Sequence, residues 1–248
     1  QEKNNLTGIA DRLIEDTDRR NSGDFWTPTL FVDYAHKMIS EQLGENWKDE
    51  YVVWDNCCGS KNLTRDYKFK ELYCSTLFDS ELNISERYNK EATSFQFDFL
   101  NDYIPMPGEL VQSDTKIPEG LLNALKENKK IVFFLNPPYA TTCNFGNKNK
   151  NEDGNDTVIN AEMKNNGMKR CSDNLYGQFL YNIIKIKRAY KLTKCHICIF
   201  CPTLFLTGES YVEFRKEFFK DFTFNTAIQF KASEFADVSD SWGISFSI

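Results

Sequence analysis

Short apolar runs alternate with amphipathic stretches along most of the chain. Seven of these runs are rich in β-branched and aromatic residues and have the length of strands. Helix-sized segments separate the first five runs, which is typical of parallel strands joined by crossover helices. About a dozen residues without helical periodicity separate the last two, which indicates a hairpin and one antiparallel strand. The expected strands are Tyr51–Asp55, Leu72–Leu77, Ser94–Asp98, Ile131–Leu135, Cys195–Cys201, Phe224–Phe230 and Trp242–Ile248.

This alternation predicts an α/β fold with a doubly wound, seven-stranded mixed sheet and a reversed edge strand. Thr27 and Pro28 have the residue types of a helix N-cap and first helical position, and the helix that they predict ends at Gly44. A further helix is expected over Glu209–Phe219. Residues 1–23 are polar and predict an N-terminal arm or short helix ahead of one domain that spans residues 24–248.

Residues 140–172 interrupt the pattern, because Asn, Lys, Gly and Asp dominate them. A loop of about thirty residues inside a compact domain is commonly either functional or disordered. This one directly follows a strand, and α/β sheets bind ligands at the carboxyl ends of their strands. We therefore expect a flexible loop on the substrate side, with a neutral surface insertion as the alternative.

The composition is that of a folded protein, with 41% hydrophobic and 27% charged residues. No apolar run approaches the roughly 18 residues of a membrane-spanning helix and no signal peptide opens the sequence, so we expect a cytoplasmic protein without membrane contact. The 30 basic and 36 acidic residues give a net charge of -6, which argues against binding nucleic acid by bulk electrostatics. The basic stretch Lys185–Lys194 is expected to be a solvated helix face.

Eight cysteines in such a chain are expected to be reduced thiols. Cys195, Cys198 and Cys201 are spaced like metal ligands. They lie in an apolar run that predicts a buried strand, however, and strand side chains alternate between two faces. Thiols on both faces cannot converge on one ion, so we expect no metal site and interpret them as small buried apolar groups. The two histidines, His36 and His196, are expected on a helix surface and in a strand.

The tetrapeptide Asn136-Pro137-Pro138-Tyr139 directly follows the apolar strand Ile131–Leu135. Two prolines fix the backbone and leave it with carbonyl acceptors. Asn136 adds an amide oxygen and Tyr139 an aromatic face. This combination suits a planar group that carries an amino function, and a proline-stiffened turn is the structural alternative.

Two further segments lie where strands end. Asp55 closes the first strand, and Gly59 permits a tight turn at which a nucleoside could approach the backbone. Asp98 and Phe99 end the third strand with an acceptor and an apolar plate, which is the pairing that an adenine ring needs. Each signal alone is weak, and their occurrence together in one chain strengthens them.

In this order the segments resemble the motifs of the S-adenosylmethionine-dependent DNA adenine-N6 methyltransferases of the gamma motif order, over nearly the whole chain from residue 24 to 248. Asp24–Pro28 looks like the family's N-terminal motif, Asp55–Leu63 like its cofactor loop, and Asn136–Tyr139 like its catalytic motif. The resemblance implies a Rossmann-like methyltransferase fold and S-adenosyl-L-methionine as cofactor. The cofactor-binding positions that it implies are Trp26, Thr27, Pro28, Asp55, Cys57, Gly59, Asn62, Thr76, Asp79, Asp98 and Phe99.

By the same resemblance, the Asn136 side chain and the Pro137 carbonyl would accept the two N–H hydrogens of an adenine amine, with Pro138 in the same catalytic motif. A base inside a duplex cannot reach such a pocket, so the target would be flipped out and stacked on Tyr139. Phe235 matches the region that supplies a second aromatic wall, and an aromatic residue tucked onto the core is the equal alternative.

Two positions depart from the family's pattern. Lys61 stands where a second glycine is usual in the cofactor loop, which would widen the loop or weaken its hold on the cofactor. No acid ends the second strand, so the contact to the ribose hydroxyls stays open between Thr76 and Asp79.

The favoured function is an adenine-specific DNA methyltransferase whose partner is DNA. Asn-Pro-Pro-Tyr also occurs in enzymes that methylate a glutamine amide of proteins, and the two departures fit a catalytically silent cofactor-binding or specificity subunit. The family usually reads its target with a region that follows the last strand of the catalytic domain, and the sequence given has none. We therefore expect weak DNA binding by this chain alone, with a restriction or specificity subunit as a candidate partner.

Overall fold

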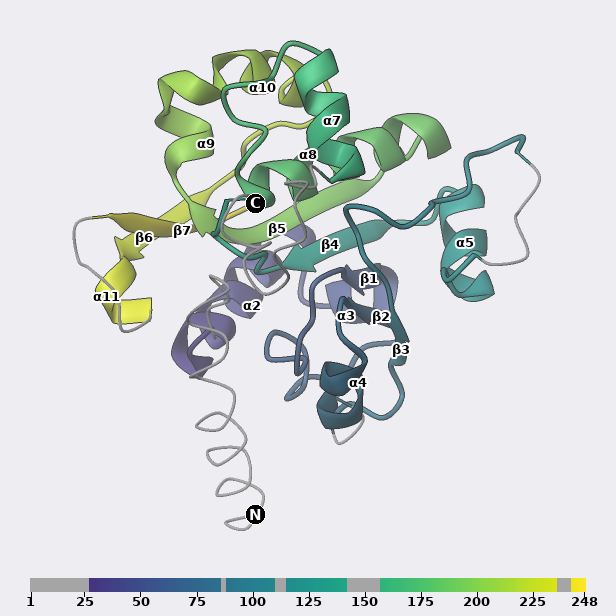
Figure 1. The fold of residues 1–248 in the computed structure, drawn as a ribbon. Coiled ribbons are helices and arrows are strands. Elements are labelled where there is room, and N and C mark those ends of the chain that lie inside the picture. Colours follow the sequence, from purple (N-terminus) through teal and green to yellow (C-terminus); the bar gives the residue numbers. More distant parts are fainter. Residues whose placement is uncertain (1–26, 86–87, 110–114, 142–156, 236–241) are drawn as a thin grey trace.

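Within the described residues, seven strands form one sheet in the order β3-β2-β1-β4-β5-β7-β6 (Figure 1). The structure is a computed structural model that describes residues 27–85, 88–109, 115–141, 157–235 and 242–248. The seven expected strands are confirmed, with ends that shift by at most three residues. Their bounds are β1 Val52–Asp55, β2 Glu71–Thr76, β3 Thr93–Gln96, β4 Ile131–Leu135, β5 Cys195–Pro202, β6 Ala227–Lys231 and β7 Gly243–Ser247.

The sheet is mixed, as expected. Strands β1 to β5 pair in parallel, and β7 pairs antiparallel with both β5 and β6. The reversed strand does not lie at the edge, however. The chain leaves β5, reaches the edge of the sheet with β6, and then returns through β7 into the position between them.

Helices cover both faces of this sheet (Figure 1). Trp54 and Phe133 face a core completed by α5, α7, α8 and α10, whereas Val53 and Phe134 face a second core completed by α2 and α3. The doubly wound arrangement is therefore confirmed. The helices are α2 Thr29–Leu43, α3 Trp47–Glu50, α4 Asp79–Ser85, α5 Glu119–Lys126, α7 Val158–Asn165, α8 Leu175–Tyr190, α9 Leu204–Thr207, the 3-10 helix η2 Glu209–Tyr211, α10 Val212–Phe218 and α11 Ala232–Phe235.

The cysteine-rich run forms strand β5, as predicted. Cys195 and Cys201 belong to one core and Cys198 to the other, so their thiols lie on opposite faces of the sheet. Burial raises the pKa of the Cys195 thiol to about 12 and raises those of the other two further. The three groups therefore behave as neutral apolar side chains.

The connection between β1 and β2 differs from the expected helical crossover. Residues 56–70 form consecutive turns, with the Lys61 N–H donating to the Cys58 carbonyl and the Thr64 N–H donating to the Lys61 carbonyl. Gly59 and Lys61 have φ angles of 48° and 61°, in the left-handed region that interrupts an α-helix. This segment is therefore a long, turn-rich loop at the carboxyl end of β1.

Helix α2 begins one residue later than expected, at Thr29, with Pro28 in the N-cap position. The side chain of Thr27 makes no cap, because its Oγ1 accepts a hydrogen bond from Asn136 instead. His36 is buried on α2 and does not lie on the helix surface as expected, since its Nε2 contacts the Leu63 carbonyl at 2.9 Å.

The expected long loop over residues 140–172 is partly helical. Helix α7 occupies Val158–Asn165, where Thr157 caps its first turn by accepting from the Asn160 N–H. Residues 142–156 lie outside the described residues, as does the predicted N-terminal arm at residues 1–23. Within the described part of the chain, the helices lack the combination of length and apolar character that a membrane span requires.

Candidate functional site

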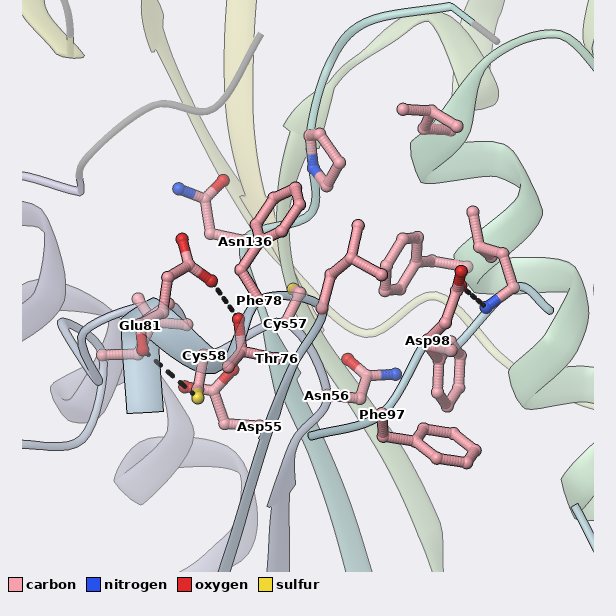
Figure 2. A pocket seen from close by; sticks show the side chains of 18 of the residues that line it. Asp55, Asn56, Cys57, Cys58, Thr76, Phe78, Glu81, Phe97, Asp98 and Asn136 are labelled. Atoms are coloured by element: carbon pink, nitrogen blue, oxygen red, sulfur yellow. Dashed lines mark hydrogen bonds between the residues drawn. The ribbon is translucent and has the colours of Figure 1, made fainter. Parts of the chain in front are cut away.

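A cavity lies at the carboxyl ends of the parallel strands β1 to β4 (Figure 2). The loop after β1, the junction of β2 with α4, the turn after β3 and the segment after β4 line it. The fold therefore brings together four segments that are far apart in the sequence. Strand ends of an open parallel sheet are the usual place for a ligand in such folds.

Most of the predicted site residues line this cavity. Pro28, Pro137 and Tyr139 lie beside lining residues without lining it themselves. Trp26 lies outside the described residues, and Phe235 ends α11 with a side chain that is also outside them. The predicted residues that do line the cavity are Thr27, Asp55, Cys57, Gly59, Asn62, Thr76, Asp98, Phe99, Asn136 and Pro138.

Lys61 keeps the loop geometry that a glycine would allow. Its φ angle of 61° lies in the left-handed region, and its side chain is buried. The ammonium group donates to the carbonyls of Tyr88 at 3.0 Å and Asn89 at 3.4 Å. The side chain thus binds the segment after α4 and takes no part in lining the cavity.

Asp55 ends β1 as a fully buried carboxyl group facing the cavity. Within the described residues, neither of its oxygens makes a well-formed hydrogen bond. Burial raises the pKa of Asp55 to about 8, although the Cys57 backbone N–H and the Lys61 charge both lower it. Such a carboxyl group is poised to accept a positively charged donor from a ligand.

The loop after β1 carries further buried polar atoms. Both amide atoms of Asn56 and the hydroxyl of Ser60 also have no hydrogen-bond partner among the residues described. Both residues are at least 98% buried and line the cavity. Buried polar groups in folded proteins are almost always satisfied, so this cluster indicates a polar ligand.

Glu81 is a cavity residue that the sequence did not single out. The Thr76 hydroxyl donates to its Oε2 (Figure 2), and both residues line the cavity. Asp79, the expected carboxylate, is exposed at the start of α4 and does not line the cavity. The first turn of α4 carries the chain over the end of β2, which brings the third residue of the helix, not the first, to the cavity.

The turn after β3 holds Asp98 in a fixed orientation. Its Oδ1 accepts from the backbone N–H groups of Leu100 at 3.0 Å and Asn101 at 3.2 Å, and its Oδ2 accepts from the Asn101 side chain at 2.8 Å. Phe99 stacks on Phe179 of α8 with ring centroids 5.2 Å apart. A carboxylate and an aromatic wall are thus presented on one side of the cavity.

Helix α7 is joined to this turn. The Asn101 side-chain oxygen accepts from the Val158 N–H at 3.0 Å, and the Leu100 carbonyl accepts from the Ile159 N–H at 3.4 Å. Thr157, the cap of α7, lines the cavity. The end of the long insertion therefore lies against the turn after β3.

Asn136 is held on both sides of its amide. Its Nδ2 donates to the Thr27 hydroxyl at 2.9 Å, and its oxygen accepts from the Tyr139 hydroxyl at 2.7 Å. Burial raises the pKa of Tyr139 well above its ordinary value, so the hydroxyl stays a neutral donor. The Tyr139 ring meets Trp242 edge to face, with centroids 6.0 Å apart. These contacts fix which way the amide oxygen points.

No protein-family model and no curated protein sequence matches the chain. A chain of the DrdV–DNA complex, solved by cryo-EM, matches 92% of this chain with 26% of its own length, at a TM-score of 0.61 and 18% identity. The type I restriction-modification methyltransferase subunit from Streptococcus thermophilus matches 91% of this chain with 44% of its own length, at a TM-score of 0.56 and 15% identity. The type ISP restriction-modification enzyme LlaGI, in complex with a DNA substrate mimic, matches 91% of this chain with 26% of its own length, at a TM-score of 0.59 and 15% identity.

These similarities concern the arrangement of the chain in space, since the identities are low. The chain spans less than half of the length of each of these three proteins. The chain therefore has the seven-stranded α/β fold of the Rossmann-like methyltransferases.

Proposed function

We propose that this protein is an S-adenosylmethionine-dependent DNA methyltransferase that acts on the N6 amine of adenine. The observation that carries the proposal is the cluster of buried polar atoms without well-formed hydrogen bonds on Asp55, Asn56 and Ser60, at the strand edge where Asn136 is also presented. A cofactor site and an amine-binding motif thus share one cavity. The match to methyltransferase structures supports the proposal.

The residues of the cavity fit the three parts of S-adenosyl-L-methionine. Asp55 would accept the ammonium group of its methionine end, and Thr76 with Glu81 would bind the ribose hydroxyls. Asp98 would accept from the adenine amine beside the Phe99 ring. When bound, the cofactor supplies an electrophilic methyl group on its sulfonium centre.

The Asn136 motif would prepare the target amine. The lone pair of an adenine amine is delocalised into the ring, so the nitrogen is a poor nucleophile. The Asn136 oxygen and the Pro137 carbonyl accept the two N–H hydrogens and localise the lone pair. Thr27 and Tyr139 hold the amide in the orientation that this requires. No titrating base needs to act before the transfer, since preorganised acceptors do the work. After the methyl group has moved from the sulfonium sulfur to N6, the positively charged nitrogen would release its extra proton to water.

The assignment of DNA as substrate has two supports. The sequence motifs follow the order of the DNA adenine methyltransferases, and two of the matching structures are complexes with DNA or a DNA mimic. An adenine must leave the duplex to reach Asn136, so we propose base flipping onto the Tyr139 ring. A restriction or specificity subunit is the proposed protein partner.

Replacing Asn136 with Ala tests the proposed role. The change removes one acceptor of the target amine and no group assigned to the cofactor, so methyl transfer should fall by at least about 100-fold. Cofactor affinity, measured by calorimetry, should stay within about twofold of wild type. The exposed Asn123 of α5 provides a control, because Asn123→Ala should change neither value. Equal loss of binding and transfer in a folded Asn136→Ala protein would contradict the role.

A further inference from the structure

Asn56 has an unexplained environment. It directly follows β1 and is only 1% exposed. Within the described part of the chain, neither its Oδ1 nor its Nδ2 has a hydrogen-bond partner. A buried amide without partners destabilises a fold, because it loses its hydrogen bonds to water and gains none in return. Such a cost in a cavity wall indicates a group that is satisfied by a ligand.

The position of the Asn56 amide restricts which part of a ligand it can contact. Figure 2 shows Asn56 between the Asp55 end of the cavity and the side formed by Phe97 and Asp98. Glu81 lies on the far side of Thr76 from Asn56 in this view. Asn56 therefore faces the region next to the carboxylate that Asp98 presents, and not the region next to Glu81.

The chemistry of the amide fits a nucleoside. An amide offers one acceptor and a donor group side by side. A carboxylate can only accept hydrogen bonds, so neither Asp98 nor Asp55, once it pairs with the ligand's ammonium group, can satisfy a ring nitrogen or a ligand oxygen that needs a donor. The edge of an adenine ring presents an amine donor beside a ring-nitrogen acceptor, which is the pattern that an Asn side chain complements.

We propose that Asn56 binds the adenosine half of the cofactor through its side-chain amide. The proposal rests on the proposed function, since it takes S-adenosyl-L-methionine as the ligand. It adds a contact that the sequence motifs do not assign. Two neighbouring residues of this loop would then bind different halves of the ligand: Asp55 would bind the amino-acid half and Asn56 the nucleoside half.

The test replaces Asn56 with Leu, which has a similar volume and no polar atoms. The variant should bind S-adenosylhomocysteine at least about tenfold more weakly, and 5'-methylthioadenosine should lose affinity by the same factor because it contains the nucleoside but not the amino acid. The ligand-free variant should melt a few degrees higher than wild type, since an unsatisfied amide has been removed. Asn123→Leu, on the exposed face of α5, is the matched control and should leave both affinities unchanged.

Several outcomes would overturn the proposal. Unchanged affinities would exclude a ligand contact, and weaker binding of S-adenosylhomocysteine alone would place the contact on the amino-acid half. A lower melting temperature of the ligand-free Leu variant would show that the amide supports the fold. If that variant does not fold, Asn56→Ala, which cannot clash, decides through the two affinities. Wild type that binds neither ligand would instead contradict the proposed function, so the two failures are distinguishable.

Discussion

Asp55 places a carboxyl group with a pKa of about 8 at the centre of the site. Burial is the main cause of this value, and the nearby Lys61 charge offsets only part of it. At neutral pH the carboxyl group of the free protein is therefore mostly protonated. A bound ammonium group favours the ionised form, so ligand binding and deprotonation are coupled.

This coupling predicts that cofactor binding releases protons. At pH 7, binding of S-adenosylhomocysteine should release close to one proton per site, because the ligand's ammonium group lowers the pKa of Asp55 below the pH. Calorimetric titrations in buffers of different ionisation enthalpy measure this number. The release should shrink at pH 9, where Asp55 is already ionised. Asp55→Asn should bind more weakly and release no proton, and proton release that survives this change would contradict the assignment.

Individual site residues were predictable where a strand end and a residue type coincide. Asp55 ends β1, Asp98 lies two residues after β3 and Asn136 directly follows β4, so their arrival at one sheet edge follows from the pattern alone. Glu81 could not be found in this way, because its position depends on where α4 begins and how its first turn crosses the end of β2. The unsatisfied state of Asn56 depends on its packing, which no local pattern encodes.

Helix α2 holds the loop after β1 in place through a buried histidine. The Nε2 atom of His36 contacts the Leu63 carbonyl, and its ring stacks on Tyr67 with centroids 3.4 Å apart. Burial lowers the pKa of His36 to about 4, so the ring is neutral in the folded protein at neutral pH. The same helix begins beside Thr27, which contacts Asn136. Helix α2 thus supports both the loop after β1 and the segment that carries Asn136.

The lowered pKa predicts how this support depends on pH. Between about pH 6.5 and pH 4 the unfolded chain binds a proton at His36 that the folded chain does not, so stability falls as pH falls through this window. The shift corresponds to at most about 3 kcal/mol. Urea unfolding at several pH values, compared between wild type and His36→Phe, measures it. The variant should be less stable at pH 7 and lose less stability on acidification; parallel pH profiles would refute the linkage.

Among the elements, strands were predicted better than their connections. Strands β4 and β5, for example, are apolar runs that are largely buried on both faces, and such runs stand out in the sequence. The turns of residues 56–70 depend on the left-handed conformation of Lys61. A lysine in the sequence does not predict this conformation, because residues other than glycine rarely adopt it. Helix α7 was hidden in a polar segment, since its stability comes from packing against α8 and from its contacts with the turn after β3. The spacing of a hairpin does not determine which of its two strands lies at the edge of the sheet, so the inner position of β7 could not be predicted.

At the scale of the molecule, two of the three basic side chains of α8 pair with acidic residues. Lys185 pairs with Glu162 at 2.6 Å, and Arg188 pairs with Asp221 at 2.7 Å and Glu217 at 3.2 Å. The chain carries a net charge of -6. These ion pairs and the net negative charge both weaken the attraction of this helix for a phosphate backbone.

We accordingly predict weak DNA binding by these residues alone. Fluorescence anisotropy with a labelled duplex at about 0.15 M salt should give a dissociation constant no tighter than the 10⁻⁴–10⁻⁶ M range of non-specific binding. Addition of S-adenosylhomocysteine should change it little, because the cofactor cavity lies away from α8's charged pairs. Tight, sequence-specific binding by this chain would contradict the prediction.

The central claim is tested most directly by following a labelled methyl group. The protein is incubated with S-adenosylmethionine labelled in its methyl group, with double-stranded DNA of mixed sequence and with a glutamine-containing protein substrate. Our account predicts label on DNA that nucleoside mass spectrometry recovers as N6-methyladenine, and its loss with Asn136→Ala. Label on a glutamine amide of the protein substrate would contradict it. So would a protein that binds the cofactor but transfers no methyl group to DNA.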